Sequence, residues 1–352
     1  MKNQTPIEYT DYLQLEKILD AQDLESQKNK GQPAHEEMLF VLTHQTYELW
    51  FKQIIWEVDS ILKIFSEKTV SDQNLSKAVH RLKRINEIWR VLISQITVLE
   101  TMTPLEFMEF RNHLYPASGF QSAQFRLIEN KLGLEEEQRE MHGGCPYHQF
   151  LKDEDKPKVM QAGEKLSLLR AVEAWLERTP YLKTKGYDFW KEYQASVEKM
   201  MNEESTLIKN NASLTEADKE KSLKAVESMK ASFKTFMDKD KFESHKNAGE
   251  WRLSFEALQA ALFIQVYRHE LKLQSANRLI ETLVDLDENM TQWRNRHAQM
   301  ALRMLGQKMG TGGSSGEAYL RAASNKHKIF MDFFKLTTFL IEGSQLEKRP
   351  QL

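Results

Sequence analysis

Residues 35–60 read HEEMLFVLTHQTYELWFKQIIWEVDS, and this stretch decides the fold. Its large apolar side chains recur every three or four residues, which is the period of an α-helix. Phe40 and His44 share one face, and further apolar residues widen it, so we expect a long helix over 35–66 that is buried on more than one side. The same spacing over 74–100 predicts a second helix of this kind. The sequence therefore favours an all-α fold of long helices.

The rest of the map follows from the same spacing and from the positions of proline and glycine. We expect, in chain order, a short helix, an irregular elbow at 115–120 and a helix stopping near Gly133; a polar surface excursion at 134–157; a helix over 158–178; two helical stretches over 250–305 with a break near 275–277; a glycine loop at 306–316; and a closing helix near 317–341.

Residues 191–248 differ in character, because they are rich in Lys, Glu and Ser. Phe233, Phe236 and Met237 form their main apolar group. We interpret this region as a peripheral, charged and helical insertion, exposed or mobile, within a single domain that spans 1–352.

Composition excludes several classes of protein. The 352 residues carry Lys+Arg 49 against Asp+Glu 51, so the net charge of -2 removes the basic attraction on which nucleic-acid binding usually rests. No apolar run approaches the roughly 18 residues that would span a bilayer, and the first residues lack the apolar segment of a secretory signal. The single Cys145 cannot form an intrachain disulfide. We expect a cytoplasmic protein.

Two features suggest ligand chemistry, each with an ordinary alternative. Five of the 14 glycines fall in GQKMGTGGSSG at 306–316, where a loop could close over a small ligand with Thr311 as a polar contact, or could simply connect two helices. Met290, Trp293, His297, Met300 and Met304 step by three and four, which places His297 within an apolar stripe. Such a histidine, like His44, is either an axial haem ligand or pocket residue, or a core residue with one hydrogen bond.

Two further patterns are weaker. Arg111, in FMEFRNHLYPASGF, could clamp a carboxylate through its two-pronged guanidinium, or form a surface salt bridge. The spacing H-x-x-C-x-x-H resembles a metal site and is formed by His142, Cys145 and His148. A structural zinc site needs four ligands, however, and the sequence offers no second cluster to supply the missing one.

Four long blocks resemble the tryptophan 2,3-dioxygenase family, whose members are haem enzymes of the kynurenine pathway. The blocks are YTDYLQLEKILDAQ at 9–22, HEEMLFVLTHQTYELWFKQIIWEVDS at 35–60, LETMTPLEFMEFRNHLYPASGFQSAQFRLIENKLG at 99–133 and WRNRHAQMALRMLGQKMGTGGSSGEAYLR at 293–321. The resemblance covers roughly residues 5–345 and is weakest in 134–157 and 191–248. It implies oxidation of L-tryptophan by O2 to N-formyl-L-kynurenine on one haem b per subunit.

The resemblance also implies roles for individual residues. His297 matches the proximal haem-iron ligand, and His44 matches the distal histidine that meets the indole nitrogen. Arg111 would hold the substrate carboxylate. The other implied contacts are Phe40, Val41, Leu42, Thr43 and Thr311 for the substrate, Ser118 and Gly119 for the haem, and Tyr9 and Tyr12 reaching a neighbouring subunit's pocket in a homotetramer. Phe107 stands where some bacterial members carry a tyrosine.

Other interpretations remain open at this point. A haem protein that binds tryptophan without turning it over would share the same pocket, and a product assay would separate the two. A helical interaction scaffold would explain the amphipathic stripes, but not the glycine loop or the apolar histidines. An indoleamine 2,3-dioxygenase-like enzyme would be broader in substrate and monomeric, whereas HQTYELWFKQ and GTGGSSG favour the tryptophan-specific branch.

Overall fold

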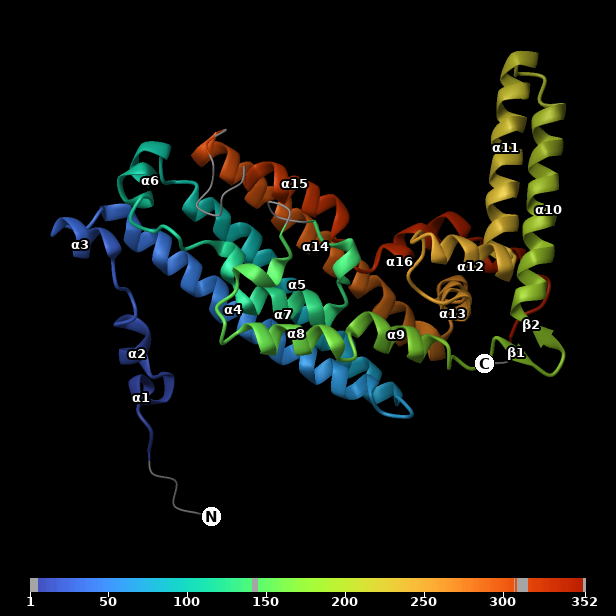
Figure 1. The fold of residues 1–352 in the computed structure, drawn as a ribbon. Coiled ribbons are helices and arrows are strands. Elements are labelled where there is room, and N and C mark those ends of the chain that lie inside the picture. The colour runs from blue at the N-terminus through green and yellow to red at the C-terminus, as the bar shows by residue number, and fades with distance from the viewer. Residues whose placement is uncertain (1–5, 141–144, 307, 309–315, 351–352) are drawn as a thin grey trace.

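Three long helices form the centre of the molecule. They are α4 (His35–Phe65), α5 (Asp72–Leu99) and α14 (Gln274–Leu305). In the computed structural model, which describes residues 6–140, 145–306, 308 and 316–350, α14 packs along α5 and α5 along α4. Figure 1 shows these helices side by side. The apolar spacing predicted α4 and α5 to within two residues of their ends. The all-α prediction is confirmed.

Shorter helices, several of them single 3₁₀ turns (η), surround this centre. The remaining elements are α1 (Tyr9–Leu13), α2 (Leu15–Leu19), α3 (Glu25–Lys30), α6 (Pro104–Arg111), η1 (Gly119–Gln121), α7 (Ala123–Leu132), η2 (Glu136–Gln138), η3 (Tyr147–Phe150), α8 (Lys156–Glu164), α9 (Leu168–Leu176), β1 (Lys183–Thr184), β2 (Tyr187–Asp188), α10 (Phe189–Asn210), α11 (Glu216–Met237), α12 (Lys239–Asn247), α13 (Phe255–Val266), η4 (Leu271–Leu273), α15 (Gly316–Lys326), α16 (Met331–Leu336), η5 (Thr337–Phe339) and η6 (Gly343–Gln345).

The two short strands, β1 and β2, pair antiparallel and were not predicted. Among the described residues, no helix combines the length and apolarity needed to cross a bilayer.

The elbow after α6 was predicted correctly, and local capping explains it. Pro104 begins α6, and Thr103 caps it in a reciprocal box with Glu106. Ser118 caps η1 in the same way, and Ser122 caps α7. Gly133 then ends α7 with φ +113, and a Cβ there would lie 2.9 Å from the Cβ of Leu169. Glycine is therefore required both by the backbone conformation and by the close approach of α9.

Three predicted helices are interrupted where tertiary contacts compete with the helical period. The 158–178 helix is two helices, α8 and α9, because Ser167 caps a new start, and α8 packs mainly on α7 whereas α9 packs mainly on α13 and α4. The break expected near 275–277 lies earlier, between α13 and α14. The closing 317–341 helix stops at Lys326, because the carboxylate of Asp287 accepts the backbone N–H groups of Ile329 and Phe330 at 2.9 and 2.5 Å.

The charged lobe is exposed along its length but anchored at its base. Helices α10 and α11 form a hairpin that projects from the body in Figure 1. Tyr193, Phe233 and Phe236 are buried in the main core, and the rings of Phe236 and Phe339 stack with centroids 4.0 Å apart. The segment at 134–157 is likewise not a simple surface excursion, since Arg139 and Leu151 are buried.

Candidate active site

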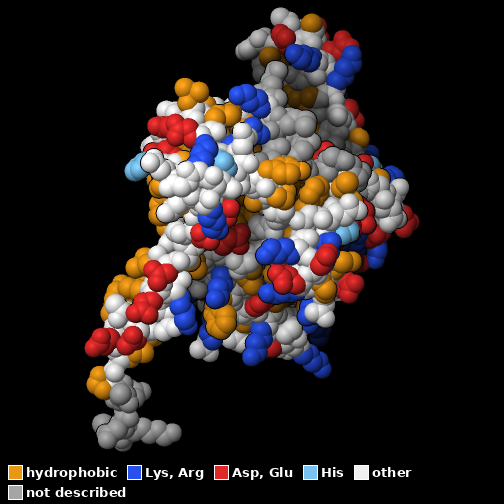
Figure 2. All heavy atoms as spheres, turned by 60° about the vertical axis from the view of Figure 1, so that its left-hand side comes forward, with side chains coloured by type: hydrophobic (Ala, Val, Ile, Leu, Met, Phe, Trp, Pro, Cys, Tyr) orange, Lys and Arg blue, Asp and Glu red, His pale blue; other side chains and the backbone are white. Residues whose placement is uncertain are grey.

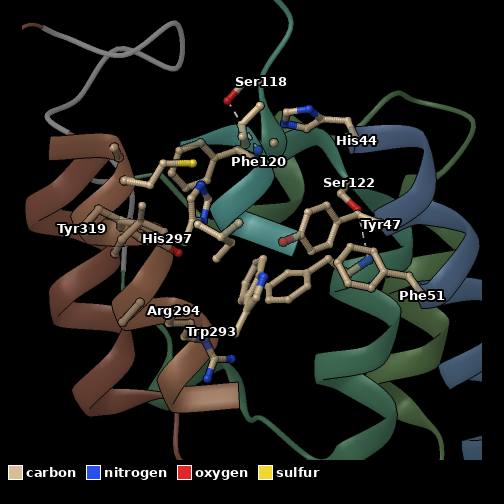
Figure 3. A pocket seen from close by; sticks show the side chains of 18 of the residues that line it. His44, Tyr47, Phe51, Ser118, Phe120, Ser122, Trp293, Arg294, His297 and Tyr319 are labelled. Atoms are coloured by element: carbon tan, nitrogen blue, oxygen red, sulfur yellow. Dashed lines mark hydrogen bonds between the residues drawn. The ribbon is translucent and has the colours of Figure 1, made fainter. Parts of the chain in front are cut away.

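A cavity of about 280 Å³ opens between α4, α7, α14 and α15, next to the elbow that follows α6. Its wall is mainly apolar, which is typical of small-molecule sites. The residues that line it are His44, Tyr47, Glu48, Phe51, Ile96, Leu99, Phe107, Arg111, Ser118, Gly119, Phe120, Ser122, Phe125, Arg126, Glu129, Trp293, Arg294, His297, Met300, Ala301, Leu305, Tyr319, Leu320, Ala323 and His327. In Figure 3, His297 enters from α14, whereas His44, Tyr47 and Phe51 enter from α4.

His297 lies in the apolar wall formed by α14. Its ring lies 5.4 Å, centroid to centroid, from that of Trp293, one turn earlier on the same face. Loss of water, with a smaller contribution from His44, lowers the pKa of His297 to about 4. Its Nδ1 is buried and has no hydrogen-bond partner among the described residues. The imidazole is therefore neutral near pH 7, which is the form that ligates a metal ion.

His44 faces the same cavity with a defined tautomer. Its Nδ1 lies 2.7 Å from the carbonyl oxygen of Phe40, so Nδ1 carries the proton and Nε2 keeps a free lone pair. The rings of Phe40 and His44 lie 4.1 Å apart and hold the imidazole in place. The side chain is accessible from the cavity, yet the protein around it excludes enough water to lower the pKa of His44. His44 thus offers the cavity a hydrogen-bond acceptor.

The end of α6 and the elbow after it contribute a guanidinium group and two small residues to the cavity wall. Arg111 is the last residue of α6, is half-buried and lines the cavity. Ser118 and Gly119 also line it, and the N–H of Phe120 donates to Ser118 Oγ at 3.4 Å. The structure therefore brings Arg111, Ser118 and Gly119 together with both histidines.

The other expected contacts that the structure describes do not line this cavity. Leu42 is 41% exposed, and Thr43 is buried toward α5, where its carbonyl accepts the side-chain amide of Gln95 at 3.2 Å. Val41 is half-buried and does not line the cavity, and Phe40 lies behind two residues that do, His44 and Phe107. Tyr9 and Tyr12 are 72% and 70% exposed on α1, and Thr311 lies outside the described residues.

The weak metal pattern finds no further support. His142 lies outside the described residues, and Cys145 and His148 are half-buried. The part of the chain that the structure describes holds no group of three or more His, Cys, Asp or Glu that could ligate a metal ion.

Sequence reasoning missed the polar end of the cavity. Glu129 is buried there among the guanidiniums of Arg126 and Arg294, which reach it from α7 and α14. His327 completes the group from the end of α15. Arg126 and Glu129 are three residues apart on one face of a helix that also carries apolar residues, which is a visible signal for an ion pair. No spacing could show that a second arginine arrives from another helix.

Fold and cavity together define the class: an all-α protein with a buried pocket for small-molecule chemistry, flanked by two neutral histidines. Comparison with known sequences then gives the family. The chain belongs to the tryptophan 2,3-dioxygenase family, whose sequence model matches residues 2–340. It is an oxidoreductase, a dioxygenase that acts on tryptophan.

Named relatives support this over nearly the whole chain. The tryptophan 2,3-dioxygenase of Bdellovibrio bacteriovorus is 47% identical over 346 residues, which cover 98% of this chain and 96% of the relative. That of Dictyostelium discoideum is 43% identical over 350 residues, covering 99% and 87%. That of Rattus norvegicus is 43% identical over 342 residues, covering 97% and 84%. The comparisons give no support to a non-catalytic sensor.

Proposed function

We propose that this enzyme opens the indole C2–C3 bond of L-tryptophan with O2, on a haem b held by His297, and places both oxygen atoms in N-formyl-L-kynurenine. The observation that carries the proposal is that His297 and His44 open into one apolar cavity from α14 and α4. The indole C2–C3 bond is the most electron-rich edge of the side chain, which suits it to attack by activated oxygen.

The residues of the cavity fit a haem. Its apolar wall suits a flat macrocycle, and His297 is a neutral imidazole with a free ring nitrogen beside that wall. When bound, haem supplies the iron that binds and activates O2.

The chain's own residues bind and orient tryptophan. Nε2 of His44 accepts the indole N–H, because the bond from Nδ1 to Phe40 leaves that lone pair facing the cavity. Arg111 pairs with the carboxylate from the α6 elbow, and Thr311 meets the ammonium and carboxylate groups. Phe40 and Phe107 give the indole an apolar surround, since Phe40 lies 5.9 Å from Phe107 between ring centroids.

Near His44, few groups of this pocket would be able to deliver a proton to O2. Phe51, Phe125 and Met300 line it and carry no acidic proton, and His44 is neutral, with its one N–H committed to a backbone carbonyl. Glu48, the nearest carboxylate on α4, accepts hydrogen bonds from Ser122 and Gln124 at 2.6 and 2.8 Å. Such a pocket disfavours reduction of O2 to water and favours its addition to the substrate.

Assembly as a homotetramer in the cytoplasm belongs to the same proposal. Tyr9 and Tyr12 lie on an N-terminal arm that projects from the body in Figures 1 and 2 and carries exposed apolar side chains. We infer that each arm packs on a neighbouring subunit and brings these tyrosines to its pocket. Trp56, 73% exposed on α4, marks another apolar surface suited to subunit contact.

The test is a spectrum recorded during turnover. Ferrous, haem-loaded protein mixed with L-tryptophan and air should show a haem band together with growing N-formylkynurenine absorbance. His297→Ala should lose the haem band, whereas His269→Ala, an exposed histidine between α13 and η4, should keep it. A normal five-coordinate spectrum in His297→Ala would remove the ligand assignment, and haem without product would remove the proposed reaction.

A further inference from the structure

A buried carboxylate beside the cavity has an unusual set of partners. Glu129 on α7 is fully buried, and its Oε2 accepts from Arg126 at 2.8 Å and from Arg139 at 2.7 Å. Its Oε1 accepts from Arg294 at 3.0 Å and lies 3.5 Å from Nδ1 of His327. All four partners are themselves buried. Each of the two carboxylate oxygens therefore has two partners.

The charges of this group are well defined. Burial alone would raise the pKa of Glu129, but Arg139 and Arg126 hold it well below its usual range. The backbone N–H of Glu140 donates to Nε2 of His327 at 2.8 Å, so the proton of His327 is on Nδ1, toward Glu129. Burial lowers the pKa of His327 and keeps it neutral. One carboxylate thus pairs with three buried guanidiniums.

The partners of Glu129 come from four separate segments around the cavity. Arg126 belongs to α7, Arg139 follows η2, Arg294 belongs to α14 and His327 follows α15. Except for Arg139, these residues and Glu129 itself line the cavity. Arg294 also donates to the carbonyl of His327 at 3.1 Å, which links α14 directly to the end of α15. Glu129 contacts all four of these residues.

The contacts of Glu129 with Arg294 and His327 connect it to elements of the candidate active site. Arg294 lies three residues before His297, about one turn of α14, and Figure 3 shows both side chains on the same helix at the cavity. Helix α15, which His327 ends, follows directly on the glycine loop that carries Thr311. The position of Glu129 therefore bears on both α14, which carries His297, and α15.

We propose that Glu129 is a positioning residue of this enzyme: through Arg294 and His327 it fixes α14 and α15, and so sets the orientation of His297 toward the haem. This inference rests on the proposed function, since it assumes that His297 ligates a haem. The alternative is that Glu129 only stabilises the fold, and a second buried carboxylate makes the two separable.

Asp287 provides the matched control. It is also buried on α14, and it also anchors the chain beyond α15 by accepting the N–H groups of Ile329 and Phe330. Unlike Glu129, it does not line the cavity, and it lies three turns before His297. A purely structural role predicts the same consequences for Glu129→Gln and Asp287→Asn.

The experiment reconstitutes wild type, Glu129→Gln and Asp287→Asn with haem, well below the melting temperature of each. We expect Glu129→Gln to lose haem at least tenfold faster than wild type and to give a heterogeneous ferric electron-paramagnetic-resonance signal. Asp287→Asn should melt at a lower temperature but stay within twofold of wild type in haem loss, with a single signal. Wild-type haem loss and one ferric species in Glu129→Gln would overturn the proposal, whereas no haem in wild type would instead overturn the proposed function.

A second variant and a measurement on wild type cover the case in which Glu129→Gln does not fold. Arg294→Lys keeps the positive charge but lacks the fork that reaches both Glu129 and the carbonyl of His327. It should show the same haem loss and mixed signal, and wild-type behaviour would count against the proposal. In wild type, haem loading should also slow amide exchange over 126–130 and at His327, and unchanged exchange there would refute the link.

Discussion

Replacing His44 with alanine tests the substrate geometry most directly. The structure leaves Nε2 of His44 as an acceptor facing the cavity, because Nδ1 is committed to the carbonyl of Phe40 at 2.7 Å. Without it, the indole N–H of bound tryptophan is buried and unpaired. An unpaired buried donor costs about 1–3 kcal/mol, so kcat/KM for L-tryptophan should fall roughly 5- to 150-fold.

The assay compares L-tryptophan with its N1-methyl derivative in both enzymes. In wild type the derivative cannot donate to Nε2, and its methyl group meets the imidazole, so wild type should prefer L-tryptophan strongly. In His44→Ala the lost ring leaves room for the methyl group, and the preference should shrink toward equality. Haem content should stay the same, because His44 lies on α4, opposite the α14 ligand. An unchanged preference ratio would refute the hydrogen bond to His44.

Three further outcomes follow from named contacts. Nε2 of His44 accepts a hydrogen bond only when neutral, and its pKa is lowered, so kcat/KM for L-tryptophan should stay level as the pH falls from 8 to 6.5 and decline only in more acidic solution; a titration centred at the ordinary histidine value would contradict this. Arg111→Ala should weaken L-tryptophan use by about 2–5 kcal/mol in kcat/KM, as for other buried charge pairs, while haem loading holds; equal loss of both would indicate a folding role. Tyr193→Phe leaves the carbonyl of Phe339 without its 2.6 Å hydrogen bond and should lower the free energy of unfolding in urea by about 1–3 kcal/mol, and an unchanged value would show that water replaces the hydroxyl.

The sequence by itself determined the helices and the candidates for chemistry. Apolar residues at helical spacing identify α4 and α5, since a repeat of three and four residues places these side chains on the same faces of a helix. The stripe around His297 and the glycine loop after it indicated a ligand site before any contact was known. The four sequence blocks then implied the family, and the match over residues 2–340 confirms it.

Tertiary structure alone decided where α15 stops and which residues meet in the cavity. The end of α15 is set by Asp287, a side chain some 40 residues away in sequence, and periodicity carries no information about such a contact. Glu129 illustrates the same limit, because three of its four partners lie outside its own helix. Periodicity reports which side of a helix is buried, whereas the partner across the interface depends on how distant helices pack. That packing brings His44 and His297 to one cavity and places a shared carboxylate behind it.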